Sequence, residues 1–185
     1  ADCLGGLLSL DLAMLVIAPI NIFMFLALYA GLRKQNESYA LVALVLALIA
    51  VVLVIQARPL AELVLLSEKY AGAEDAAEQM LYLSAGSALH SYFSGTAWII
   101  QTAFFMVAGL INCLLMLRVT YFRRVTAVLG IANSVVGLGF FLPGIGLPLL
   151  FLNTIGTIPW CILLAGDFFR LVKMKKPVSA HEEIH

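Results

Sequence analysis

The stretch YALVALVLALIAVVLVIQA, residues 39–57, decides the fold class, because no charged side chain interrupts it. A helix that crosses a bilayer needs about 20 mainly apolar residues. Arg58 and Pro59 end the run, the first by its charge and the second because proline disrupts a continuing helix. The stretch therefore predicts a transmembrane helix.

The composition extends this prediction to the whole chain. Of its 185 residues, 63% are hydrophobic and 12% are charged, and the mean hydropathy is +1.02. A soluble domain has about 45–50% apolar and about 25% charged residues. The formal net charge is zero, which gives no reason to expect nucleic acid as a partner. We expect an integral membrane protein whose constant partner is membrane lipid.

Five segments are long and apolar enough to span a bilayer, and each ends at a basic residue or at Pro-Gly. Between the second and third, the chain predicts an external helical segment at about 59–94, restarted at Pro59, with bends at Gly86 and Gly95. The predicted fold is an all-α integral membrane helix bundle over residues 1–170, followed by a tail at 171–185. The predicted spans are 12–32, 39–57, 97–117, 125–142 and 146–169.

Lysine and arginine gather in alternate connections. Arg33 and Lys34 follow the first span, three arginines lie at 118–124, and more basic residues begin the tail, whereas residues 58–95 carry five acids against two bases. Cytoplasmic loops are enriched in Lys and Arg. We therefore expect a protein of the cell (inner) membrane with its N-terminus outside and its C-terminus in the cytoplasm. A cytoplasmic first loop after an outside start predicts an upstream sixth helix, or a cleaved signal peptide.

Three stretches carry a resemblance: DLAM at 11–14, LALYAGLRKQN at 26–36, and FFMVAGLINCLLMLRVTYFRRVTAVLG at 104–130. With them the chain, from about Leu10 to Phe169, resembles an uncharacterised bacterial and archaeal family of multi-pass membrane proteins, known only as a domain of unknown function. The resemblance implies a further N-terminal helix and no nameable activity. The family tends to have a glycine soon after the FF pair, where this chain has Met106, so the close helix contact that glycine permits is an open question.

The amide side chains within the spans are the first candidates for a site. Asn21, Asn133 and Asn153 fall near mid-membrane, and Gln101 lies toward the outside. Polar groups in a bilayer are costly and are functional hypotheses by default. Two interpretations stay open, namely hydrogen bonds between helices, which we favour, and a site for a polar headgroup or quinone carbonyl. The middle of the spans holds no ionisable residue, which argues against a proton relay.

Two ionisable residues are candidates at the outer face. Asp11 lies at the boundary of the first span, where it is expected to cap or face the positive N-terminal end of the helix. His90 lies at the outer mouth of the third span. It is expected to be an interfacial belt residue, with an alternative role as a metal ligand or acid–base group beside Glu78 or Asp11. The residue spacing predicts no metal site and no cofactor.

The remaining polar features have ordinary explanations. Asp167 and Arg170 are expected to form an i,i+3 pair at the cytoplasmic end of the fifth span. HEEIH, residues 181–185, is expected to be a solvated tail. The cysteines are odd in number and lack a CxxC spacing, so neither a disulfide framework nor a zinc site is predicted; they are Cys3, Cys113 and Cys161.

Three functional classes follow, in this order. The first is a non-catalytic subunit or scaffold that packs against other membrane protein subunits, favoured by small-xxx-small steps such as Ala27 to Gly31 and Gly130 to Ser134. The second is a carrier or binder of a small apolar or lipid-like molecule. The third is a lipid-modifying enzyme acting at the outer face. The sequence points to no catalytic residue, and an enzyme is the less favoured answer.

Overall fold

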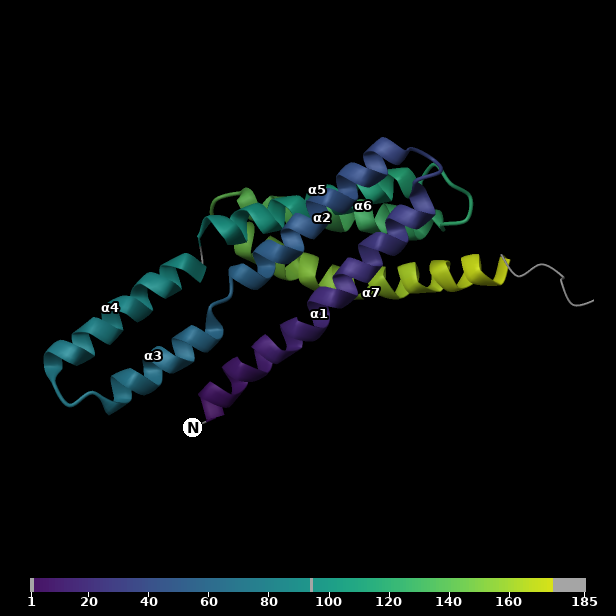
Figure 1. The fold of residues 1–185 in the computed structure, drawn as a ribbon. Helices are drawn as coiled ribbons and strands as arrows, with labels where there is room; N and C mark the ends of the chain where they lie inside the picture. Colours follow the sequence, from purple (N-terminus) through teal and green to yellow (C-terminus); the bar gives the residue numbers. More distant parts are fainter. Residues whose placement is uncertain (1, 94, 175–185) are drawn as a thin grey trace, which may run out of the picture. The chain divides into compact units, whose positions relative to one another are not determined.

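The computed structural model describes residues 2–93 and 95–174, which fold into helices joined by short connections (Figure 1). No strand occurs in this described part, so the predicted all-α fold is confirmed. The helices are α1 (Asp2–Leu32), α2 (Glu37–Gln56), α3 (Leu60–Gly72), α4 (Ala76–Phe93), α5 (Thr96–Met116), α6 (Arg124–Leu138), the 3-10 helix η1 (Gly139–Phe141) and α7 (Gly146–Met174).

The length and composition of these helices are those of a multi-pass membrane protein. Four helical stretches are long and apolar enough to cross a bilayer, and Val16–Leu32 of α1 forms a shorter apolar one. In hydrocarbon a backbone must satisfy its own hydrogen bonds, which a helix does within one segment. The four stretches are Glu37–Gly72, Ala76–Met116, Arg124–Phe141 and Gly146–Lys173.

The chain divides into two compact units, which are described separately below. The first comprises residues up to Gly31 together with Leu41–Ala108, and the second comprises Leu32–Ala40 together with the residues from Gly109 on. Helix α5 passes from the first unit into the second between Ala108 and Gly109.

In the first unit, aromatic contacts join helices that are distant in sequence. The rings of Phe25 and Phe105 stack with their centroids 6.0 Å apart, which ties α1 to α5. The Arg58 guanidinium lies over the Trp98 ring, 5.6 Å from its centroid. Such cation–π contacts hold a charge against an apolar surface. The contact between Arg58 and Trp98 holds the junction of α2 and α3 beside the start of α5.

Helices α3 and α4 form a hairpin within residues 59–94, the range for which a helical segment was predicted (Figure 1). Helix α3 restarts directly after Pro59, as predicted. Asp75 caps α4 by accepting the backbone N–H of Ala77. The predicted bend at Gly86 is wrong, because α4 continues unbroken through this residue. A Cβ at Gly86 would meet nothing within 4 Å, so this glycine is not required by close packing.

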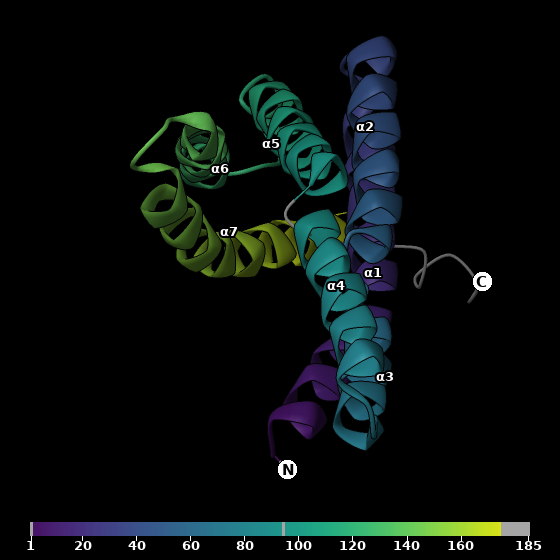
Figure 2. The ribbon, with the colours of Figure 1, turned by 90° about the vertical axis from the view of Figure 1, so that its left-hand side faces the viewer.

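In the second unit, α6 and α7 are joined by η1 and a tight turn (Figure 2). The α-helix of the predicted span 125–142 ends at Leu138 and tightens into η1. Gly144 then adopts φ +86°, a conformation that side chains disfavour. A Cβ at Gly146 would collide with the carbonyl oxygen of Phe140. The two glycines therefore let the chain reverse within a few residues.

Helix α1 begins well before the predicted span 12–32. It starts at Asp2 and continues to Leu32, with Pro19 inside it. Asp11 therefore lies within the helix rather than at its start, so the predicted capping role is wrong. The apolar count placed the membrane boundary at residue 12, but a helix can extend beyond the hydrocarbon. The side chain of Asp11 lies outside the described side chains, as do residues 175–185 of the tail.

Candidate functional site

Two amides and a hydroxyl link the second half of α6 to the first half of α7. The side-chain amide of Asn153 donates to the backbone oxygen of Asn133 at 2.8 Å. The side-chain amide of Asn133 donates to the Thr157 hydroxyl at 2.9 Å, and that hydroxyl donates to the backbone oxygen of Asn153 at 2.8 Å. These three residues form a closed polar cluster, the amide cluster.

The amide cluster depends on close approach of the two helices. A Cβ at Gly156 would collide with the side-chain oxygen of Asn133, so glycine leaves the space that this amide occupies. The donors of Asn133 and Asn153 are both engaged within the protein. The favoured interpretation, hydrogen bonding between helices, therefore describes these two residues.

Asn21 and Gln101, both in the first unit, make local bonds instead. The Asn21 amide donates to the backbone oxygen of Ile17 at 3.0 Å, one turn earlier in α1 and just before the Pro19 interruption. The Gln101 amide donates to the hydroxyl of its neighbour Thr102 at 3.2 Å. The bond of Asn21 is therefore within its own helix, not between helices as expected.

A second polar cluster joins the end of α7 to the start of α6, and Asp167 is its centre. Its side chain is 0% exposed. One carboxylate oxygen accepts the Thr126 hydroxyl at 2.7 Å and the backbone N–H of Arg123 at 3.2 Å. The other lies 3.2 Å from Nε of Arg123 and 3.9 Å from Nη1 of Arg170. We call this group the Asp167 cluster.

The physical reason for this cluster is the N-terminus of α6. Arg123 is the N-cap residue, and no side chain of its own first turn caps the helix. The positive end of a helix attracts an anion, and its first N–H groups need acceptors. Asp167, on α7, supplies both the negative charge and an acceptor oxygen. Phe122 and Phe168, in edge contact with centroids 5.6 Å apart, pack beside it, and burial raises the pKa of the adjacent Tyr121.

Sequence reasoning missed the Asp167 cluster. The expected i,i+3 pair with Arg170 is present but long and half-exposed. The nearer partners are 41 and 44 residues away in sequence. A usable signal existed, since the first turn of α6 contains no acidic residue while a lone aspartate ends the next span.

Of the two outer-face candidates, Asp11 and His90, only His90 has a described side chain. His90 is exposed and lines a hollow of about 400 Å³ between α3 and α4, walled by Leu63, Leu66, Ser67, Tyr70, Tyr82, Leu83, Gly86 and Ser87. This wall contains no carboxylate. The Glu78 carboxylate accepts the Tyr82 hydroxyl at 3.0 Å. Among the side chains described, no three His, Cys, Asp or Glu residues gather as metal ligands.

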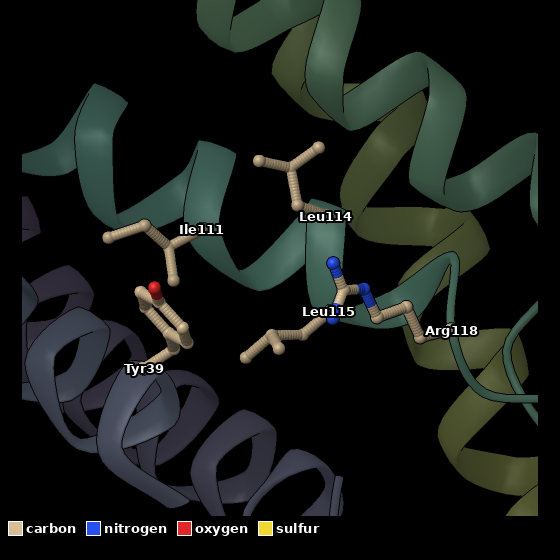
Figure 3. A pocket seen from close by; sticks show the side chains of 5 residues that line it. All are labelled: Tyr39, Ile111, Leu114, Leu115 and Arg118. Carbon is tan, nitrogen blue, oxygen red and sulfur yellow. The ribbon is translucent and has the colours of Figure 1, made fainter. Parts of the chain in front are cut away.

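A smaller hollow opens on the second unit, lined by Tyr39, Ile111, Leu114, Leu115 and Arg118 (Figure 3). Its volume is about 280 Å³ and its walls are mostly apolar. We call it the Arg118 groove.

One buried amide remains without a bond. Asn112 is 2% exposed, and its side-chain oxygen has no hydrogen-bond partner among the described residues. An unsatisfied buried acceptor carries a desolvation penalty of about 1–3 kcal/mol. Asn112 lies on α5 in the second unit, one turn before the end of the helix.

Comparison with known proteins places the chain in a family. The family described as Domain of unknown function (DUF4386) matches residues 5–167. No curated protein and no solved structure matches the chain. The resemblance drawn from the FF pair, the arginine-rich loop and the Asp-Leu-Ala-Met stretch is thereby confirmed. With most of its length matched, this multi-pass membrane protein belongs to the DUF4386 family.

Proposed function

We propose that the protein is a non-catalytic membrane subunit or scaffold, which packs against the helices of partner membrane proteins. The proposal rests on the observation that the buried polar groups bond to one another within the protein. Asn133, Asn153 and Thr157 are bonded to one another, and Asp167 is bonded to Thr126 and Arg123. These groups therefore build a stable helix pair.

The outward surface of that pair supports the proposal. Large apolar side chains recur along α7 at helical spacing and are more than half exposed, which leaves a long face for lipid or a partner helix. Packing between transmembrane helices is driven by van der Waals contact rather than by a hydrophobic difference from lipid. The residues are Leu147, Phe151, Ile155, Ile158, Ile162, Phe169 and Val172.

Native mass spectrometry of the protein, extracted from its own membrane in a mild detergent, tests the proposal. We expect a defined assembly heavier than one chain. Ile155→Trp, on the exposed face of α7, should reduce that assembly, whereas Val128→Trp, equally apolar and exposed on α6, should leave it intact. A single chain without partners in this experiment, and in a preparation crosslinked in cells before extraction, would overturn the proposal.

We further propose that the membrane is the cell (inner) membrane and that the α3–α4 hairpin faces outside. The support is the distribution of basic residues. Arg33, Lys34, Arg118 and Lys173 flank one set of helix ends, while the hairpin, residues 60–93, carries five acids against one lysine. Cytoplasmic flanks are enriched in Lys and Arg.

A further inference from the structure

The Arg118 groove combines an apolar wall with a cationic rim. Ile111, Leu114 and Leu115 are presented by the last turns of α5. Figure 3 shows the ring of Tyr39 facing Ile111 and the Arg118 guanidinium reaching back over the helix end toward Leu114 and Leu115. A ligand lying here would meet hydrocarbon along its length and a positive charge at one end.

Arg118 differs from its neighbour Arg123 in what balances its charge. Nε of Arg123 lies 3.2 Å from the buried carboxylate of Asp167. Within the described residues, no carboxylate pairs with Arg118, which is exposed at the groove. A guanidinium binds carboxylates and phosphates through paired N–H donors. In the described part of the chain, Arg118 is therefore a cation without a paired carboxylate beside an apolar surface.

The excess of basic residues in the second unit also favours an anionic ligand. Residues 32–40 and 109–174 contain seven bases (Arg33, Lys34, Arg118, Arg123, Arg124, Arg170 and Lys173) and two acids (Glu37 and Asp167). These residues lie at the start of α2, the end of α5, the start of α6 and the end of α7. One of the two acids is the buried partner of Arg123. An anionic occupant is thus complementary to this end of the unit.

We propose that the Arg118 groove binds a lipid of the surrounding membrane that carries an anionic phosphate headgroup. The phosphate pairs with Arg118, the Tyr39 hydroxyl is available as a further donor, and an acyl chain lies along Ile111, Leu114 and Leu115. Basic pockets between helices at the cytoplasmic side are suited to anionic headgroups. A free phosphate ion would leave the apolar wall unused. This binding site goes beyond the proposed subunit role and does not depend on it.

Native mass spectrometry of the full chain in lipid–detergent mixtures tests the site, using phosphatidylglycerol and phosphatidylcholine with identical acyl chains. We expect preferential retention of phosphatidylglycerol. Arg118→Gln should lower that retention about fivefold, which corresponds to the loss of about 1 kcal/mol. Arg124→Gln removes the same charge at the start of α6, outside the groove, and should change retention less than twofold.

A second pair of variants tests the apolar wall. Leu114→Trp fills the groove and should reduce phosphatidylglycerol retention, whereas Leu152→Trp, at an exposed leucine of α7 outside the groove, should not. Equal retention of the two lipids would overturn the proposal. So would equal losses in Arg118→Gln and Arg124→Gln, because these would show a diffuse surface charge, or an unchanged Leu114→Trp. Circular dichroism and elution volume confirm that each variant is folded.

Discussion

The Thr126 hydroxyl donates a 2.7 Å hydrogen bond to the fully buried carboxylate of Asp167, across 41 residues of sequence. The bond joins the first turn of α6 to the last turns of α7. The amide cluster joins the second half of α6 to the first half of α7. Because the two connections lie far apart along the helices, they fix both the distance and the register of the pair.

Replacement of Asp167 should destabilise the fold. Asp167→Asn weakens the ion pair with Arg123 and the charged acceptor of the Thr126 hydroxyl. A hydrogen bond to a charged group contributes about 1.5–3 kcal/mol, so we expect a loss of that size in the free energy of unfolding in detergent. Chemical or thermal unfolding followed by circular dichroism measures it.

Arg170→Gln is the matched control for Asp167→Asn. The Arg170 guanidinium is half-exposed and 3.9 Å from the carboxylate, and exposed ion pairs contribute about 0–1 kcal/mol. If Arg170→Gln lowered the free energy of unfolding as much as Asp167→Asn does, the contacts of Asp167 with the start of α6 would not be the main source of its stabilising effect.

Asn153→Leu and Asn112→Leu should change stability in opposite directions. The first removes a bond between helices, and such bonds in membranes contribute about 0.6 kcal/mol on average and up to about 1.7. The second replaces a buried, unsatisfied amide by an apolar side chain of similar shape, which relieves a desolvation penalty. Thermal unfolding of both proteins in one detergent compares them; a loss in Asn112→Leu would indicate a bond or bound water at that amide.

Gly130→Ala should destabilise the protein by about 1–3 kcal/mol through overpacking. The added Cβ would collide with Sγ of Cys113 and Nε1 of Trp160, the first on α5 and the second on α7. Gly166→Ala is the control, because a Cβ there meets nothing within 4 Å and alanine favours helix. The melting temperatures of the two variants should therefore separate, and identical values would contradict the close packing at Gly130.

The proposed orientation predicts which residues face outside. In intact cells, a membrane-impermeant maleimide should label Ser84→Cys, on the exposed surface of the hairpin, in a Cys3→Ser background. A cysteine introduced at Lys173, in the last turn of α7, should react only after the cells are broken. The reverse pattern of labelling would invert the topology.

The sequence was most informative about features that depend on the residues of one segment alone. Apolar spans were expected at 39–57, 97–117 and 146–169. Helices α2 and α5 cover all but the last residue of the first two, and α7 covers the third. It was less informative at helix ends. The start of α1 and the continuity of α4 through Gly86 depend on backbone conformation, which an apolar count does not detect.

The sequence did not predict whether a close helix contact forms near Met106, because that contact involves residues far apart in sequence. Gly109 of α5, three positions later, faces Ser134 of α6, since a Cβ there would lie 3.0 Å from the serine hydroxyl. Ser134 and Gly130 form the small-xxx-small step that the sequence showed, but only the folded structure pairs it with α5 and α7.

By itself the sequence determined that this is a helical membrane protein, because apolar length and composition act within each segment. The family followed from the resemblance carried by residues 11–14, 26–36 and 104–130. The tertiary structure decided the use of the polar groups. Asp167 has an obvious partner in Arg170, one turn away, yet its carboxylate is held by Arg123 and Thr126. Which donors meet a carboxylate depends on how α6 and α7 pack, and that packing results from many contacts between distant residues.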